Sequence, residues 1–166
     1  IDIEINYSFD TDLGSLNIGV RGTHILKYEI PDLSGGFKDV VGLFNHDNFA
    51  RSLPETKIIS TVDLINNHHI FSLLGRYTSD YKTTRVLSSS AASLGYNQNV
   101  DEWLSIDSKY NYSFEFNENQ MQFSFGIKNI FDKSAPQVYD AANFSYDPRQ
   151  HDPRGRLTYI GLKLLR

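Results

Sequence analysis

The sequence contains no cysteine, which excludes a disulfide scaffold, thiolate metal sites and cysteine nucleophiles. It also contains no uninterrupted apolar run near the roughly 20 residues that a transmembrane helix needs. No basic cluster occurs, and the net charge of −4 argues against a nucleic-acid-binding surface, so we expect no nucleic-acid partner. These absences still permit a membrane protein that crosses by strands, because alternating strands need no long apolar run.

Aromatic residues, by contrast, are abundant, with 11 Phe and 10 Tyr among 166 residues. Hydrophobic residues make up 40% and charged residues 22%, a composition that indicates neither disorder nor low complexity. Apolar and polar residues alternate without interruption from Ile1 to Phe9, and similar alternation recurs along the chain. Such alternation is typical of strands with one apolar and one wet face. It predicts an all-β protein, and we identify seven strands and no convincing helix.

The predicted strands are separated by connections that alternate strictly between short turns and long loops. The strands cover about 1–9, 16–30, 57–65, 71–81, 104–116, 121–131 and 157–166. Two of the long connections, 31–56 and 87–102, contain the residue types that favour loops, and a third precedes the last strand. This layout is typical of transmembrane barrels, whose tilted strands need about 9–11 residues, whereas strands of soluble proteins average about five or six.

Aromatic residues are predicted at both ends of the apolar face, where membrane barrels carry girdles at the two interfaces. Those expected near the short turns are Phe9, Phe71, Phe114, Phe116 and Phe123. Those expected near the long loops are Tyr28, Tyr81 and Phe131. The alternative is a soluble β-sandwich, in which the apolar face would simply be the core.

The C-terminal part of the chain carries a series of motifs in a characteristic order. Asn129-Ile130-Phe131-Asp132 ends the sixth predicted strand, Tyr146-Asp147 and Gly155-Arg156 follow, and the last strand contains Tyr159-Ile160-Gly161-Leu162. In this order the motifs resemble the C-terminal end of TonB-dependent outer-membrane receptors. The family commonly ends in an aromatic residue, whereas this chain ends in Arg166.

The resemblance implies an antiparallel transmembrane β-barrel segment, about seven strands of a larger, 22-stranded barrel. Residues 1–166 would be the C-terminal part of that barrel, and we expect the chain to be a fragment or processed piece. The plug domain and the earlier strands would lie outside it. Two alternatives remain: a small self-contained outer-membrane barrel with a structural or adhesive role, and a soluble extracellular β-sandwich that binds sugar or protein.

The function implied by the resemblance is active transport across the outer membrane of a Gram-negative bacterium. Such a receptor binds a scarce ligand, such as a ferric siderophore or a carbohydrate, at its extracellular loops. It imports the ligand with energy delivered through TonB. The implied partners are outer-membrane lipid, TonB, the plug domain, the remaining barrel strands and a small-molecule or oligosaccharide ligand.

Candidate ligand-binding residues lie in or next to the long loops, where aromatic side chains mix with amides and an occasional Arg. That mixture suits both carbohydrate stacking and siderophore binding. The candidates are Phe44, His46, Asn48, Arg51, Tyr96, Asn97, Trp103, Tyr139, Phe144 and Tyr146. For any single candidate, packing of the loops against one another is the alternative role.

Charged residues on the inner wall form a second group, which we expect to pair with one another or with a plug. These lumen-facing residues are Arg21, Arg76, Asp107, Lys109 and Lys128. Catalytic signals are weak, because no Gly-x-Ser-x-Gly motif occurs. The adjacent His68 and His69 would point to opposite faces of a strand, which is a poor arrangement for a metal. We therefore expect no enzyme activity, no metal site and no cofactor.

Overall fold

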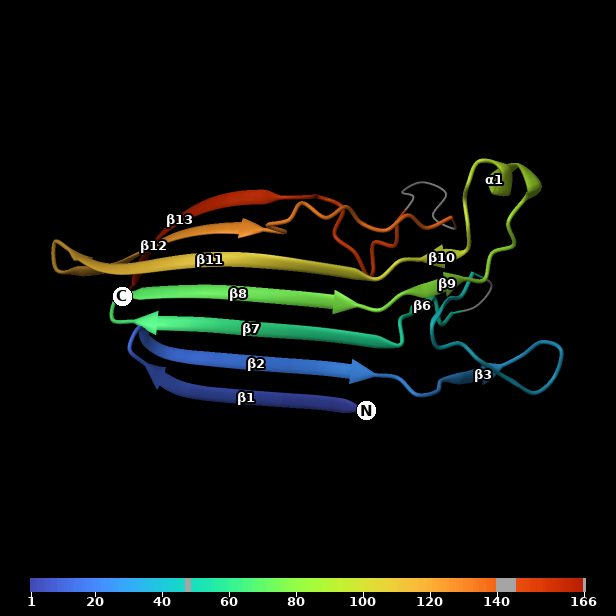
Figure 1. Ribbon diagram of the computed structural model, residues 1–166, viewed down its shortest axis with the longest axis horizontal. Helices are drawn as coiled ribbons and strands as arrows, with labels where there is room; N and C mark the ends of the chain where they lie inside the picture. The colour runs from blue at the N-terminus through green and yellow to red at the C-terminus, as the bar shows by residue number, and fades with distance from the viewer. Residues whose placement is uncertain (47–48, 140–145, 166) are drawn as a thin grey trace.

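A computed structural model describes residues 1–46, 49–139 and 146–165 of the protein. One seven-stranded antiparallel sheet dominates it, and each strand pairs with its neighbours in chain order (Figure 1). Its strands are β1 (Asp2–Thr11), β2 (Gly14–His24), β7 (Thr56–Asn66), β8 (His69–Thr78), β11 (Trp103–Phe116), β12 (Asn119–Lys128) and β13 (Leu157–Leu165). The prediction of an all-β fold with seven long strands is confirmed.

The register of the sheet aligns the alternation of every strand into two continuous faces. Ile18 of β2 lies opposite Tyr7 on one side and Val62 on the other, and Phe125 lies opposite Ile160. Directly opposed residues of antiparallel strands point to the same side of a sheet. One face is therefore apolar across all seven strands and the other is polar.

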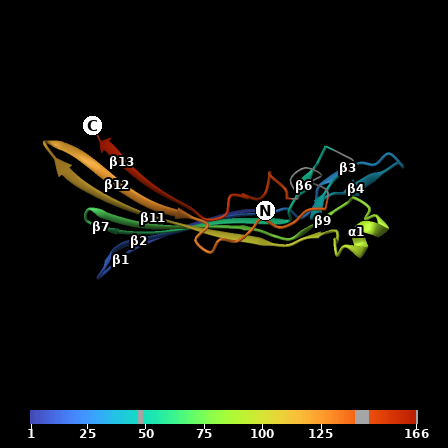
Figure 2. The same ribbon diagram turned by 90° about the horizontal axis from the view of Figure 1, so that it is seen from above.

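The apolar face is exposed. Ile5 is 58% exposed, Leu162 64% and Ile160 72%, although all three lie within long strands. Seen from above, the large sheet is a single curved layer (Figure 2). Within the described residues, β1 and β13 are the two edges and do not pair with each other, so the sheet is open rather than closed into a barrel.

The long connections form smaller structures beyond one end of the large sheet (Figure 1). A four-stranded sheet has the order β10 (Asn99–Val100), β9 (Tyr81–Thr83), β5 (Leu43–Phe44) and β6 (Ser52–Leu53). A hairpin joins β3 (Glu29–Pro31) to β4 (Phe37–Asp39), and α1 (Ser89–Ser93) begins at a Ser88 cap. Nowhere in the described ranges is a helix long and apolar enough to cross a bilayer.

Several predicted boundaries are wrong at this end of the sheet. The strand predicted over 16–30 ends at His24, and Tyr28 lies beside the separate β3–β4 hairpin, where its N–H donates to Asp39 Oδ1. Tyr81 begins β9 and is buried among loop residues, where its hydroxyl donates to the buried Asp147. Phe131 follows the end of β12. None of the three aromatics predicted near the long loops therefore lies on the large sheet.

The aromatics predicted near the short turns are placed as expected. Phe9, Phe71, Phe114, Phe116 and Phe123 all lie in long strands, on the apolar face. The loops themselves were predicted without regular structure, and this is also wrong, since β4, β5 and β6 lie within 31–56 and α1 and β10 within 87–102. These strands of two or three residues and the five-residue helix are too short to produce a detectable periodicity in the sequence.

Candidate functional site

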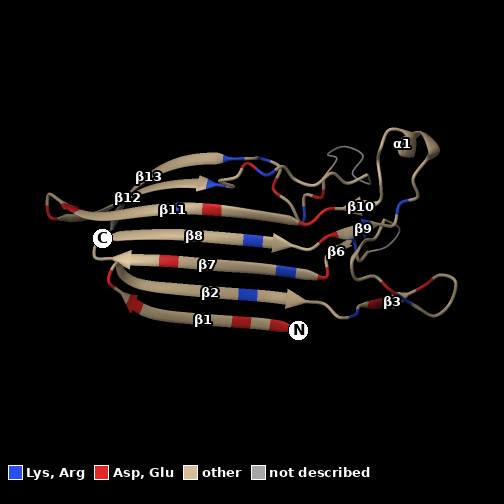
Figure 3. Ribbon diagram, in the orientation of Figure 1, with Lys and Arg blue, Asp and Glu red and all other residues tan. Residues whose placement is uncertain are grey.

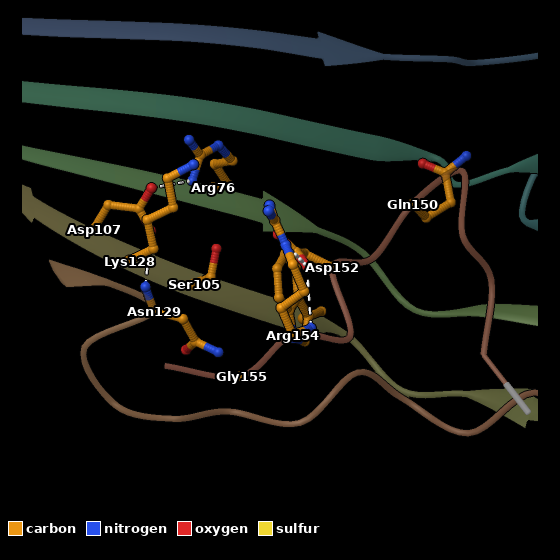
Figure 4. A pocket seen from close by; sticks show the side chains of 10 residues that line it. Arg76, Ser105, Asp107, Lys128, Asn129, Gln150, Asp152, Arg154 and Gly155 are labelled. Atoms are coloured by element: carbon orange, nitrogen blue, oxygen red, sulfur yellow. Dashed lines mark hydrogen bonds and ion pairs between the residues drawn. The ribbon is translucent and has the colours of Figure 1, made fainter. Parts of the chain in front are cut away.

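A polar pocket of about 290 Å³ lies at the long-loop end of the polar face (Figure 4). Its floor comes from β8, β11 and the end of β12, and its rim from the segment that leads into β13. The lining residues are Arg76, Trp103, Ser105, Asp107, Lys128, Asn129, Gln150, Asp152, Arg154 and Gly155. The sequence had indicated four of them as candidates: Arg76, Trp103, Asp107 and Lys128.

Asp107 organises the floor of the pocket. Arg76 lies opposite Ser105 in the register, and Asp107 follows two residues along β11, so all three side chains share the polar face. Arg76 Nη1 donates to Asp107 Oδ2 at 2.8 Å, and the backbone N–H of Asn129 donates to Asp107 Oδ1 at 2.9 Å. One carboxylate therefore joins β8 to the start of the third long loop.

The Asn-Ile-Phe-Asp motif closes the base of this third loop. The Asn129 side chain brackets Lys133, donating to its carbonyl at 2.9 Å and accepting from its N–H at 3.0 Å. Asp132 Oδ1 accepts the backbone N–H of Arg156 at 2.7 Å, which ties the start of the loop to its end. Asn129 and Asp132 both have positive φ, 50° and 55°, a conformation that Asn and Asp tolerate better than most residues.

The rim is formed by the segment that returns to β13. Arg154 binds Asp152 through two donors, with Nε to Oδ1 at 2.9 Å and Nη2 to Oδ2 at 2.6 Å. These hydrogen bonds hold the pKa of Asp152 at about 2. Gln150 accepts from Lys57 Nζ at 2.8 Å and donates to Ser52 Oγ at 3.1 Å, so the segment is held across the strand ends of β7 and β6.

A buried aromatic cluster lies beside the pocket. The His151 ring is stacked near Tyr81, with 6.0 Å between centroids, and meets the Trp103 ring edge-on at 5.7 Å. Tyr81 donates its hydroxyl to Asp147 at 3.0 Å. Burial, reinforced by Asp147, raises the pKa of Tyr81, whereas burial lowers the pKa of His151. Trp103 Nε1 and both ring nitrogens of His151 are buried and have no hydrogen-bond partner among the described residues.

The loop candidates are not brought together into one site. Phe44 packs against the buried core of Tyr81, Val100 and Val138 and therefore has a structural role. Tyr96 and Tyr139 face each other with ring centroids 5.8 Å apart. Their position on the loop surface is compatible with the stacking role predicted for them.

The remaining loop candidates are dispersed. The His46 N–H donates to Thr84 Oγ1, Arg51 approaches the His46 carbonyl at 3.5 Å, and Asn97 caps the N–H of Asn99. Tyr146 lines a shallow hollow outside the main pocket. Asn48 and Phe144 lie outside the described residues.

The candidates predicted to face a lumen all lie on the polar face of the sheet. Arg76 pairs with Asp107 at 2.8 Å, a pair within the group, whereas Arg21 pairs with Glu4 at 2.9 Å, a residue outside it. Lys109 and Lys128 line a second hollow next to the pocket and make no ion pair within the described part of the chain. Their expected pairing therefore stays a prediction.

Sequence reasoning missed the residues of the returning segment, above all Gln150, His151, Asp152 and Arg154. The Asp-x-Arg spacing was a usable local signal, because it allows a bidentate ion pair across a turn. Nothing local indicated that this segment would reach β7, which lies more than 90 residues earlier in the chain.

The described residues contain no group of three or more His, Asp or Glu side chains arranged to hold a metal ion. No protein-family model, curated protein or solved structure matches this chain.

Proposed function

We propose that these seven strands are part of a transmembrane β-barrel in the bacterial outer membrane, and that the barrel is a TonB-dependent transport receptor. The observation that carries the membrane part is the exposed apolar face, continuous across seven strands of one sheet layer. A soluble sandwich would need a second sheet on that face, and within the described ranges the other two sheets lie beyond the strand ends.

The distribution of charge supports a lipid-facing surface. By the register, every Asp, Glu, Lys and Arg of the seven long strands lies on the polar face, from Asp2 in β1 to Lys163 in β13. Figure 3 shows how these charges are distributed along the strands. A charged side chain on the lipid face of a barrel costs about 2–4 kcal/mol at the bilayer midplane. A face in contact with hydrocarbon must exclude charged side chains, whereas a water-filled interior accepts charges of both signs.

Strand length and connectivity support the same proposal. The long strands contain 9 to 14 residues, enough to cross a bilayer at a tilt. All the short turns lie at one end of the sheet and all the long loops at the other (Figure 1). Outer-membrane barrels have this asymmetry, with short periplasmic turns and longer extracellular loops.

The open sheet edges support a larger barrel. The outer edges of β1 and β13 carry unpaired backbone groups in the described structure. In hydrocarbon each such group costs several kcal/mol, so further strands must complete the sheet. The receptor role rests on the C-terminal motifs, from Asn129 to Leu162. The ligand class is a scarce small molecule, such as a ferric siderophore or an oligosaccharide, that enters from the long-loop side.

Neighbouring substitutions in β2 test the membrane assignment. In the full-length protein, Ile18→Arg should cost about 2–4 kcal/mol of folding free energy in lipid, because Ile18 lies mid-strand on the apolar face. Asn17→Arg, the matched control on the polar face, should cost less than about 1 kcal/mol. Both are measured by denaturant titration in vesicles. Equal penalties at the two positions would remove the lipid-facing assignment.

The receptor assignment has its own test. Deletion of TonB should abolish ligand uptake by cells that contain the full-length protein, while the amount of folded barrel stays unchanged. Uptake that continues without TonB would leave a membrane barrel but not an energised receptor.

A further inference from the structure

We propose that the polar pocket at the long-loop end binds an anionic oxygen group, a carboxylate or phosphate, of the ligand. The pocket is the one lined by Arg76, Lys128 and Arg154 together with Trp103. The inference rests on the proposed function in taking the anion to belong to a transported ligand. The anion site itself is argued from charge, unused donors and access.

The charge of the pocket lining favours an anion. Three cationic side chains line the pocket, against two acidic ones, Asp107 and Asp152. Each carboxylate is bound to one guanidinium, Asp107 to Arg76 and Asp152 to Arg154. The lining therefore has a net charge of one positive, and Lys128, which attracts Asp152 only at longer range, is its cation without an ion pair among the described residues. In Figure 4 its side chain and that of Arg76 end on the same side of the pocket. An anion placed there would be attracted by both cations.

The pocket also offers hydrogen-bond donors that are not used within the described structure. Lys128 Nζ has no partner in the described part of the chain, and Arg76 uses only Nη1 in its contact with Asp107. Trp103 is 5% exposed, and its Nε1–H is buried with no partner among the described residues. This N–H is shielded from solvent, so Trp103 contributes its ring to the pocket lining, and the donors open to an anion are those of Lys128 and Arg76.

The pocket is accessible to solutes and large enough for an anionic group. The Lys128 side chain is exposed and the pocket opens on the polar face, so a solute in the lumen can reach it. The volume of about 290 Å³ holds a carboxylate or phosphate group together with part of a larger molecule. The ion pair of Asp152 with Arg154 and the bond of Asp107 to the Asn129 N–H keep the walls in place before the anion arrives.

A carboxylate in this pocket could have two sources: a soluble ligand, or an acidic side chain from another segment of the same protein that fills the lumen. The experiment separates them. Full-length protein in detergent is labelled with 5-fluorotryptophan, and the ¹⁹F resonance of Trp103 is assigned by its loss in Trp103→Phe. Inorganic phosphate and succinate are then titrated at constant ionic strength against a chloride background.

We expect the Trp103 resonance to shift saturably with phosphate or succinate. Lys128→Gln should raise the dissociation constant about fivefold, because it removes the net positive charge of the pocket lining. Arg154→Gln should raise the dissociation constant at least as much, because Asp152 then loses its ion-pair partner and its negative charge repels the anion. Lys163→Gln, an exposed lysine on the same face at the opposite end of the sheet, is the matched control and should change it less than twofold.

Two results would overturn the proposal. Equal weakening by Lys128→Gln and Lys163→Gln would mean that anions only respond to the general charge of the face. A resonance that does not move with either anion, combined with a lower melting temperature in Lys128→Gln, would mean that an acidic side chain of the protein occupies the pocket. Neither result depends on transport, so failure of the anion site is distinguishable from failure of the receptor assignment.

Discussion

His151 is a buried ionisable ring held between Tyr81 and Trp103, and this environment makes it sensitive to protonation. Burial lowers its pKa, although the nearby Asp147 opposes this and Lys57 adds to it. An unfolded histidine binds a proton as the pH falls below about 6.5, and the buried ring resists doing so. The folded loop cluster is therefore expected to lose stability as the pH falls from about 6.5 toward the lowered pKa, and to be unaffected at higher pH.

Replacing His151 with Phe should remove this pH dependence. The substitution keeps the stacked ring and removes two buried nitrogens that have no partners among the described residues. The cluster should therefore gain about 1 kcal/mol of stability. Hydrogen exchange of 81–83 and 147–152, measured between pH 5 and 8, reports the effect. The exposed turn residue His68, changed to Gln, is the control and should leave the wild-type dependence intact. Protection that still falls at pH 5 in His151→Phe would assign the effect to another group.

A second residue-scale prediction concerns Gly126, which is covered by a tyrosine ring from the next strand. Tyr159 lies opposite Gly126, and a Cβ added there would overlap its ring. Gly126→Ala should therefore destabilise the protein by about 1–3 kcal/mol, because the ring must move. At Gly161, on the same face, the nearest atom to an added Cβ is Ser124 Cβ at an ordinary 3.7 Å. Gly161→Ala should cost clearly less in the same unfolding titration, and the reverse order would contradict the packing argument.

At the scale of the elements, the alternation of each strand predicted all seven long strands, because a sheet with one apolar and one wet face leaves a period of two in the sequence. It did not locate the end of β2. Leu26, Tyr28 and Ile30 continue the same parity after the chain has left the sheet. The strand predicted over 71–81 was also too long. Tyr81 continues the apolar parity, but it begins the separate strand β9 and its hydroxyl donates to the buried Asp147.

The candidate site was less predictable than the strands for a related reason. Parity alone placed Arg76 and Asp107 on one face, and the structure joins them by an ion pair. The rim of the pocket depends on contacts between residues far apart in sequence, such as Lys57 with Gln150, for which no local pattern exists. The order of the C-terminal motifs was visible in the sequence, but their role in closing the third loop depends on the contact between Asp132 and Arg156, which are far apart in the chain.

The short turns offer a prediction at the same scale. The β11–β12 turn has positive φ at both central residues, 47° at Asn117 and 64° at Glu118. Asn adopts this conformation readily, whereas Glu does not. Glu118→Gly should therefore stabilise the protein by about 0.5–1 kcal/mol. Glu115→Gly, within β11, is the control and should destabilise it by a similar amount. The denaturant midpoints of the two variants are compared with that of the wild type. If both midpoints shift in the same direction, the turn is not strained.

At the scale of the whole molecule, the large sheet is curved and its two faces differ in polarity. The apolar face carries no Asp, Glu, Lys or Arg in any of the seven long strands, and the polar face carries residues of both signs. Within the described residues the sheet has no hydrophobic core of its own, and the buried apolar residues lie mainly in the loop cluster. Its stability must therefore come from strand pairing and from whatever covers the two faces.

The open edges lead to a prediction for residues 1–166 expressed alone. β1 and β13 each present a row of backbone donors and acceptors that the described structure leaves unpaired. In hydrocarbon such an edge costs several kcal/mol for each unsatisfied group, and in water it is a template for pairing with another chain. The isolated segment refolded in detergent should therefore form aggregates or ill-defined oligomers, despite the strong alternation of every strand. Size-exclusion chromatography and heat-dependent gel migration measure this. A homogeneous monomer whose migration changes on heating would mean that the seven strands close by themselves, and the small self-contained barrel would then replace the larger receptor as the explanation of the fold.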